Sequence, residues 1–551
     1  MDRIDHLLGP APFNLNDAGR AWVRETLAGM TTAQKVRHLF IHICFGTSPG
    51  LPAEIAALEP AGITKFFGPD GAAELDTLDA IRAAAPIPYL ISADLEGSRM
   101  SPSFGTEVPN PLALAATDDV QASATIAEIM AREARAAGVN WSFTPVLDIN
   151  AAFRSPIVAT RGLGSDPTRI RAHALAHIST LQGNGVAATA KHWPGEGHDD
   201  RDQHLVTTIN PLTMEEWEAT HGALYRATIS ADVLSVMSAH IAFPAFADVE
   251  GVEAYRPASV SHRLTHTLLR EHLGFNGVIV SDATPMAGFG AWGPRDVMLP
   301  EVITAGCDLI LFSDAPLDDI ARIEAAVADG RISMDRLNEA VTRTLGLKAS
   351  LNLHEVGRAP ADRSKLATPQ DAATARAITA RAPTLVKDTK GILPLNPVRH
   401  RRVLVYSTGI VTPLHGAAQP LAFIDMLRTE GFDVTLYDAD TNPDPASFDL
   451  VLYLMAEETL LTRGRIFLDW GRLAGGMRGA MRRAWHDVPT ALISFGYPYY
   501  LYDAPRLPCL INAYCTMDSM QAATLNCLLG RADFLGTSPV DPFCGLPDAR
   551  F

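Results

Sequence analysis

The chain has 551 residues, 47% of them hydrophobic and 20% charged, which is typical of a globular protein with two or three domains. Its formal net charge of −16 would repel nucleic-acid phosphates and anionic lipids, so neither is expected as a partner. The N-terminus lacks the apolar run of a secretion signal, and no stretch is long and apolar enough to span a membrane, so we expect a cytoplasmic location. The six cysteines show no CxxC spacing and are expected to be buried free thiols.

Short apolar runs alternate with helical stretches from about residue 36 to 314. Most of the runs are continuously apolar, as expected for parallel strands that are buried on both faces. The predicted strands are 36–45, 63–68, 88–94, 140–148, 186–193, 232–240, 277–283 and 308–314, and helices are expected at 119–137, 167–184, 214–230 and 259–273. Eight such units predict a (β/α)8 TIM-type barrel.

A second α/β unit follows the barrel. After a helix at 335–350, the polar, proline-containing segment 351–371 is typical of a linker. Further strands are expected at 403–408, 434–439, 449–456, 489–496 and 508–514. We therefore predict a barrel domain at 1–350, a linker at 351–371, and a smaller α/β/α sandwich-like domain at 372–551.

Polar and ionisable side chains gather where the barrel strands end. They are Asp94, Asp148, Lys191, His192, His240 and Asp282. The carboxyl ends of the strands form the catalytic face of a barrel, so the fold and a site at this face support each other.

The densest group of ionisable residues is KHWPGEGHDDRDQH, residues 191–204. It could be a solvated charged loop, but Lys191 and His192 leave an apolar strand and would face the barrel mouth. A metal site could draw on His192, His198 and His204 with Asp199 and Asp202. The spacing matches no standard ligand helix, and Lys191 would repel a cation, so we expect no metal and no other cofactor.

This segment resembles the KHFPGHG…DSH signature of the β-N-acetylglucosaminidases of glycoside hydrolase family 3. Similar family elements occur in the same order along the barrel: DLEGSR (94–99), FTPVLDIN (143–150), RGLGSDP (161–167), VMSAHIAFP (236–244) and GFNGVIVSDATPM (274–286). The second half resembles the second domain of the two-domain members at 384–395, 494–505 and 511–530. The resemblance therefore spans nearly the whole chain.

The resemblance implies retaining hydrolysis of terminal β-linked N-acetylglucosamine, or another N-acetylhexosamine, from small glycosides, as in cell-wall turnover. A carboxylate on one face of the sugar and a proton donor on the other would serve its oxocarbenium-like transition state. By resemblance, Asp282 is the nucleophile, His204 the general acid/base and Asp202 its partner. The expected substrate-binding residues are Asp94, Arg161, Lys191, His192, Met237 and His240, with Arg99 and Glu196 as possible additions.

Several positions depart from the family pattern. Trp193 replaces a phenylalanine, Glu196 a histidine, Ser101–Pro102 stands where a second arginine is common, and Ala283 replaces an aspartate. These departures bear on the sugar more than on the reaction.

Other functions stay open at this point. The chain could cleave a different sugar, act as a β-N-acetylglucosaminide phosphorylase, or be a non-catalytic sugar-binding or regulatory member. Glu457 or Glu458 could supply a rival acid from the second domain, although the Asp202–His204 pair makes this unnecessary. The G-x-G-x-x-G match at 288–293 lies in the loop after Asp282 and lacks the strand–turn–helix context of a dinucleotide site. The oligomeric state is not determined by the sequence.

Overall fold

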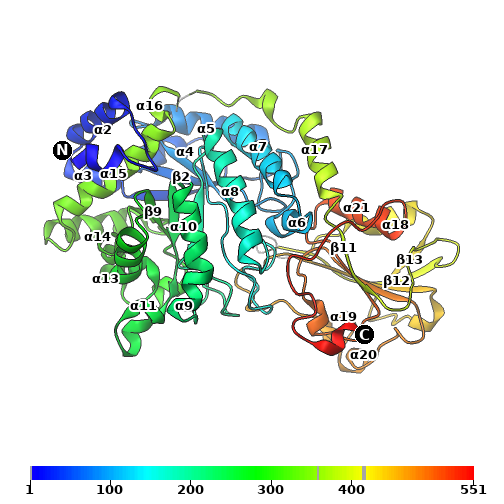
Figure 1. Cartoon of the computed structure of the whole chain (residues 1–551). Coiled ribbons are helices and arrows are strands. Elements are labelled where there is room, and N and C mark those ends of the chain that lie inside the picture. The colour runs from blue at the N-terminus through cyan, green and yellow to red at the C-terminus, as the bar shows by residue number, and fades with distance from the viewer. Residues whose placement is uncertain (1–2, 357–358, 413–416) are drawn as a thin grey trace.

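The computed structural model describes residues 3–356, 359–412 and 417–551. Two sheets organise the chain, and Figure 1 shows the barrel, blue to green, beside the second domain, yellow to red. Each sheet has its own large hydrophobic core. The predicted fold class is confirmed.

All eight predicted barrel strands are present. They are β1 (Phe40–Phe45), β2 (Gly62–Phe66), β3 (Leu90–Ala93), β4 (Trp141–Ser142), β5 (Thr189–Trp193), β7 (Ser235–Ser238), β9 (Val278–Ala283) and β10 (Leu309–Leu311). Their order is β4-β3-β2-β1-β10-β9-β7-β5, and neighbouring strands are parallel. Parallel bridges from Trp141 to Ala187 and from Val146 to Lys191 join the two ends of the sheet and close the barrel.

Helices surround the strands. They are α1 (Arg3–Leu8), α2 (Asp17–Gly29), α3 (Thr32–Arg37), α4 (Leu51–Leu58), α5 (Gly71–Ala84), α6 (Pro111–Ala116), α7 (Val120–Ala137), α8 (Pro167–Gly183), α9 (Met214–Trp217), α10 (Ala223–Ser230), α11 (Pro244–Ala247), α12 (Ala287–Gly290), α13 (Arg295–Thr304), α14 (Pro316–Ala328) and α15 (Met334–Ser350). The predicted helix 214–230 contains a π-helical turn, Glu218–Gly222, and the predicted helix 259–273 is π-helical over Arg263–His272. Local capping explains why several helices begin where they do. At α8 the side chain of Asp166 accepts the backbone N–H of Thr168, and the first helical residue is Pro167, which has no N–H to leave unpaired.

A small parallel sheet was not predicted. Its strands, β6 (Thr208–Ile209) and β8 (Ile241–Ala242), have only two residues each. The sheet ties the long loop after β5 to the segment after β7.

The second domain is a six-stranded sheet in the order β11-β16-β15-β14-β12-β13. Its strands are β11 (Thr384–Asp388), β12 (Arg402–Val411), β13 (Asp433–Leu436), β14 (Leu450–Glu457), β15 (Thr490–Ser494) and β16 (Cys509–Asn512). The five predicted strands are present, and the unpredicted β11 pairs antiparallel with β16 at the edge. In Figure 1, α18 (Ala422–Thr429) and α21 (Asp518–Leu528) lie on one side of the sheet, and α19 (Trp470–Leu473) and α20 (Met477–Ala480) on the other.

Between the two sheets the chain forms α16 (Leu353–Val356) and α17 (Pro369–Thr379). Helix α17 packs against α6, α7 and α21 and begins inside the segment predicted as linker; residues 357–358 of that segment lie outside the described residues. We propose 1–350 and 372–551 as the two domains, since α15 completes the barrel at Ser350; the second boundary falls inside α17, ahead of the second sheet. Nowhere in the described ranges is a helix both long and apolar enough to cross a membrane.

Candidate active site

The carboxyl ends of the barrel strands surround a cavity of about 370 Å³, a size typical of small-molecule sites. Eight of the predicted site residues line it: Asp94, Arg99, Arg161, Lys191, His192, His204, Met237 and Asp282. The other three, Glu196, Asp202 and His240, are buried beside it without lining it. The structure therefore brings most of the predicted residues to one place and puts the rest behind them.

Two cations and two carboxylates form a network on the β3 and β5 side of the cavity. Lys191 Nζ lies 2.8 Å from Asp94 Oδ1 and 2.7 Å from Glu96 Oε1. Arg161 binds Glu96 through two hydrogen bonds of 2.7 and 2.9 Å. Burial would raise the pKa of Glu96, but the Arg161 and Lys191 charges outweigh it and hold the pKa far below its ordinary value. The network presents fixed donors and acceptors of the kind that sugar hydroxyls require.

A buried Asp–His pair lies next to this network. His192 Nδ1 is 2.6 Å from Asp148 Oδ2, and Asp148 Oδ1 accepts the backbone N–H groups of His192 (3.1 Å) and Glu196 (2.9 Å). Burial would raise the pKa of Asp148, but the His192 ring and these hydrogen bonds lower it. His192 Nε2 is 3.4 Å from Arg161. Asp148 was recognised at a strand end but not predicted as a site residue.

The loop after β5 carries a second Asp–His pair. Gly197 has a φ of 106°, and a Cβ there would lie 1.9 Å from the carbonyl oxygen of Ile149, so the tight turn requires glycine. Beyond it, Asp202 Oδ1 accepts from His204 Nδ1 (2.7 Å) and from the His204 backbone N–H (2.8 Å). Burial would raise the pKa of Asp202, but its hydrogen bond with His204 outweighs burial and lowers the pKa. Because Nδ1 faces Asp202, Nε2 is the His204 atom that can exchange a proton in the cavity.

Glu196 is enclosed between the two pairs. Its carboxyl group meets Gln203 Nε2 at 3.2 Å and Thr208 Oγ1 at 3.4 Å. Burial, and the nearby carboxylates of Asp148 and Asp202, raise the pKa of Glu196 well above its ordinary value. The raised pKa and the enclosed position suit a support for the loop better than a contact to substrate.

Asp282 ends β9 beneath the cavity, where its Oδ1 accepts the backbone N–H of Ala283 at 2.7 Å. Burial would raise the pKa of Asp282, but the nearby imidazoles of His192 and His240 outweigh it and hold the pKa below its ordinary value. His240 was predicted to bind substrate, yet both its ring nitrogens are engaged within the protein, by Ser259 Oγ (2.9 Å) and the Ala283 carbonyl (3.0 Å). His240 thus supports the segment that carries Asp282.

The second domain supplies part of the cavity wall; the sequence had offered Glu458 as a residue that could reach the site, but not the other contacts. Glu458, Thr459 and Leu461, which follow β14, line the cavity. The backbone N–H of Thr462 donates to Asp202 Oδ2 at 2.8 Å, so the second domain holds one oxygen of the Asp202–His204 pair. Contacts across some 260 residues of chain leave no local spacing signal.

Arg99, Glu457 and Glu458 are engaged by other residues of the protein. Arg99 donates to Thr516 Oγ1 (2.9 Å) and to the Thr516 carbonyl (3.0 Å), so it links the domains. Glu458 accepts from Ser98 (2.7 Å) and from Thr516 (2.6 and 2.9 Å), whereas Glu457 accepts from Tyr500 (2.9 Å). Both glutamates are engaged in protein contacts.

The metal alternative has little geometric support. Within the described ranges, the group close enough to share an ion is Asp148, His192 and Glu196, whose ligand atoms lie within 4.8 Å of one another. Both Asp148 oxygens already accept hydrogen bonds, and the carboxyl oxygens of Glu196 meet Gln203 and Thr208. The set weighed from the sequence, His192, His198 and His204 with Asp199 and Asp202, is not gathered among the described residues. His198 instead lies against His221, with ring centroids 5.3 Å apart.

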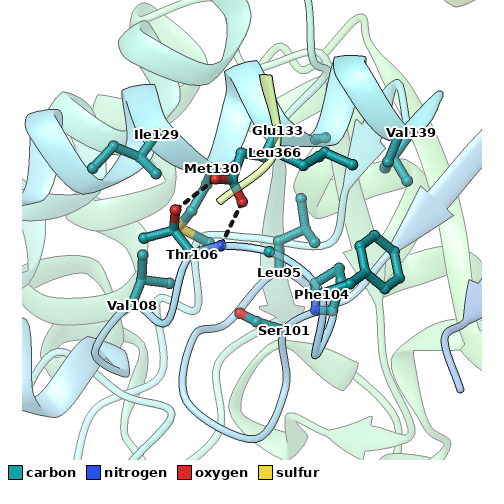
Figure 2. A pocket seen from close by; sticks show the side chains of 14 residues that line it. Leu95, Ser101, Phe104, Thr106, Val108, Ile129, Met130, Glu133, Val139 and Leu366 are labelled. Atoms are coloured by element: carbon teal, nitrogen blue, oxygen red, sulfur yellow. Dashed lines mark hydrogen bonds between the residues drawn. The ribbon is translucent and has the colours of Figure 1, made fainter. Parts of the chain in front are cut away.

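A second, much smaller cavity of about 30 Å³ lies behind the loop that follows β3. Figure 2 shows Glu133 on α7 beside it, accepting hydrogen bonds from the backbone (2.7 Å) and hydroxyl (2.6 Å) of Thr106. Such a space holds about one water molecule. It is a packing gap beside the loop of Asp94 and Glu96 and too small for a substrate.

Comparison with known proteins identifies the family. Residues 72–347 match the glycosyl hydrolase family 3 N-terminal domain. The chain is 40% identical over 98% of its length to a β-N-acetylglucosaminidase/β-glucosidase of Cellulomonas fimi, covering 99% of that protein. It is 36% identical over 45% of its length to a β-hexosaminidase of Stenotrophomonas maltophilia (strain R551-3), covering 73% of it.

Solved structures agree with this assignment. A β-glucoside phosphorylase bound to 2FGlc superposes with a TM-score of 0.90 at 31% identity, over 98% of this chain and 100% of that one. A family 3 β-N-acetylglucosaminidase from Paenibacillus sp. str. FPU-7 shares the fold, with a TM-score of 0.80 at 24% identity over 93% of this chain and 99% of that one. The chain belongs to glycoside hydrolase family 3.

Proposed function

We propose that this chain is a retaining β-glycosidase that removes terminal β-linked N-acetylglucosamine from small glycosides. The observation that carries the proposal is that Asp282 and His204 line one cavity, so a carboxylate and an imidazole can act on the same sugar. The C. fimi relative, similar over nearly the whole chain, is named for N-acetylglucosaminidase and glucosidase activities, which supports N-acetylglucosamine and keeps glucose as the competing sugar.

The reaction takes two displacements in this proposal. Asp282, whose lowered pKa favours the carboxylate, attacks the anomeric carbon and forms a glycosyl-enzyme. His204 Nε2 protonates the departing oxygen, with Asp202 orienting the ring and stabilising the imidazolium. His204 then takes a proton from water, which attacks the anomeric carbon and releases the sugar with its β configuration retained.

The remaining polar side chains bind the sugar in this proposal. Asp94, Arg161, Lys191 and His192 offer charged and neutral partners to its hydroxyl groups, and Met237 contributes an apolar wall. Because the Lys191–Asp94 and Arg161–Glu96 contacts already exist, little reorganisation is needed when the substrate binds.

Covalent trapping tests the nucleophile. Incubation with an activated 2-fluoro glycoside should add one glycosyl mass, which peptide mapping places on Asp282. Asp282→Asn should lower kcat on aryl β-N-acetylglucosaminides by on the order of 10⁴-fold. Asp314→Asn is the matched control, since Asp314 is exposed after β10. An adduct on another residue, or full activity of Asp282→Asn, would contradict the assignment.

Phosphorolysis is the second candidate, favoured by the whole-chain similarity to a β-glucoside phosphorylase. Once His204 has given up its proton its ring is neutral, and it lacks the fixed negative charge with which a carboxylate would repel phosphate. Product analysis separates the candidates. Free sugar in phosphate buffer supports hydrolysis, whereas a sugar 1-phosphate that appears only with phosphate supports phosphorolysis.

A further inference from the structure

The catalytic cavity has two chemically different sides. The polar side follows β3, β5 and β9 and holds the charged network together with Asp282. The other side follows β2 and β10 and is lined by Phe66, Phe67 and Phe312, with Met100 from the loop after β3. A sugar with all its hydroxyls to satisfy suits the first side and leaves the second for a different part of the ligand.

Three phenylalanines lead from this apolar side to the surface. Phe66 ends β2, Phe45 ends the neighbouring β1, and Phe312 directly follows β10. The rings of Phe66 and Phe312 lie 6.1 Å apart at 59°, and those of Phe66 and Phe45 lie 4.9 Å apart at 26°. Phe45 is outside the cavity and 57% exposed. We call Phe312, Phe66 and Phe45 the aromatic row.

The side chains of the aromatic row are more exposed than those of core residues. Phe66 and Phe312 are only partly buried, and burial in the core would have covered Phe45. The row is also continuous with the catalytic cavity, which points to part of the same ligand.

Phe312 has a strained backbone. Its φ is 47°, in the left-handed region that aromatic residues rarely adopt. The hydroxyl of Thr284 donates to its carbonyl at 2.8 Å, which helps hold this conformation. Strain of this kind persists where the surrounding structure enforces it, and it gathers at functional sites.

We propose that the aromatic row is the binding site for the leaving group and takes an aglycone with a flat aromatic ring. This inference rests on the proposed glycosidase function, because it needs the sugar on the polar side. An aglycone must lie on the side of the cavity that opens to solvent, and the row runs that way. Stacking on Phe66 and Phe312 rewards an aromatic ring, whereas these two side chains offer no hydrogen-bond partner to the hydroxyls of a second sugar.

Binding of hydrolysis-resistant thioglycosides tests the proposal without turnover. The probes are the phenyl and methyl 1-thio-β-glycosides of N-acetylglucosamine, measured by calorimetry on the full chain. The wild type should bind the phenyl compound about tenfold more tightly than the methyl compound. Phe66→Leu and Phe312→Ala should reduce that ratio to about twofold. Phe312→Tyr keeps an aromatic ring and should retain the wild-type ratio, and Phe45→Ala should reduce the ratio less than the other two losses.

Controls separate the row from general effects. Phe467→Ala removes a phenylalanine that is 37% exposed outside the cavity and should keep the wild-type ratio. Phe66→Leu keeps an apolar side chain of similar size. A lower affinity ratio in this variant, while it remains folded, would therefore be due to the missing aromatic ring.

Three outcomes would overturn the proposal. The affinity ratio could stay unchanged in Phe66→Leu and Phe312→Ala, or these variants could lose affinity for the phenyl and methyl compounds equally. The wild type could also bind a thio-linked disaccharide more tightly than the phenyl compound. Failure of the proposed function is distinguishable, since it would show as a lack of covalent adduct on Asp282. If the protein binds only glucosides, the same ratio is measured on the phenyl and methyl 1-thio-β-glucosides.

Discussion

Two Asp–His pairs stand at the same end of the barrel and are built alike, yet their surroundings differ. In each pair a carboxylate oxygen faces His Nδ1, at 2.6 Å for Asp148–His192 and 2.7 Å for Asp202–His204. In each, the carboxylate also accepts the backbone N–H of its own histidine. The side chain of His192 is 4% exposed, whereas that of His204 is 24% exposed.

The difference in exposure suggests different roles for the two pairs: binding for the enclosed one and proton exchange for the exposed one. His192 is enclosed, with Arg161 next to its second nitrogen, and Asp148 is part of the barrel. His204 lies on a loop, and its partner Asp202 is held from the second domain by Thr462. A proton donor must reach both substrate and solvent during the cycle, so the loop pair suits catalysis and the buried pair suits binding.

The largest expected effect distinguishes the two histidines by kinetics. His204→Asn should lower kcat/KM by about 10²–10⁴-fold on alkyl glycosides, whose leaving oxygen needs a proton. The loss should be much smaller on a dinitrophenyl glycoside, because this leaving group departs unprotonated. His192→Asn should act mainly through KM, by about tenfold, and equally for both leaving groups. Steady-state kinetics on a leaving-group series measures this.

Azide provides the control for His204→Asn. If the second displacement has lost its base, azide should restore turnover of the dinitrophenyl glycoside and yield a glycosyl azide. If His204→Asn and His192→Asn showed the same dependence on the leaving group, the two pairs would not differ in function as proposed.

The next effect concerns stability. Asp148→Asn should lower the free energy of unfolding by about 3–5 kcal/mol, since it strips the partner from a fully enclosed histidine. Asp202→Asn should cost about 1–2 kcal/mol, because His204 reaches solvent. Urea denaturation at pH 7 measures both, and equal losses would contradict the comparison.

The pH dependence of this effect has a defined sign. The folded pKa of Asp148 is lowered, so its stabilisation is present above the unfolded value of about 3.9 and disappears as the pH falls through the folded value. The difference between wild type and Asp148→Asn should therefore shrink in acid.

Glu196, which lies between the two pairs, gives a second pH effect, of the opposite sign. Its folded pKa is raised, so its contribution to stability is complete below the unfolded value of about 4.3 and is lost as the pH rises towards the folded value. Glu196→Gln should gain on the wild type by about 1.4 kcal/mol per pH unit in that window. Denaturation of both proteins at pH 4, 6 and 8 measures the gain, and a constant difference would show that Glu196 is charged in the fold.

The barrel could be predicted because its strands are buried on both faces, which leaves long apolar runs in the sequence. The same reasoning missed β6 and β8, since strands of two residues carry no pattern. It also missed β11, where Leu385 is exposed and Lys387 and Asp388 interrupt the apolar run. Antiparallel edge strands of this kind look like surface segments in a sequence.

The site could be predicted in part for a related reason. Side chains at strand ends share one face of a barrel, but the sequence does not tell how deep each lies. His240 was therefore expected in the cavity although its ring is engaged behind Asp282. Thr462 and Leu461 could not be found, because only the folded arrangement of the two domains brings them to the barrel.

The smallest expected effect concerns the rival acid from the second domain. Glu458 lines the cavity. If Glu458 were the proton donor, His204 would not be needed in that role. Its carboxylate, however, accepts from Ser98, Thr516 and Asn110, which join the two domains. These contacts hold Glu458 as a link between the domains.

Glu458→Gln should therefore keep kcat/KM within a few-fold of the wild type on alkyl and dinitrophenyl glycosides alike. It should cost about 1 kcal/mol of stability through the weakened contacts between the domains. Asp469→Asn, an exposed change in the same domain, is the control. A loss of about 10²-fold or more, confined to alkyl glycosides, would transfer the proton donor to Glu458 and leave the Asp202–His204 pair with a binding role like that of its buried counterpart.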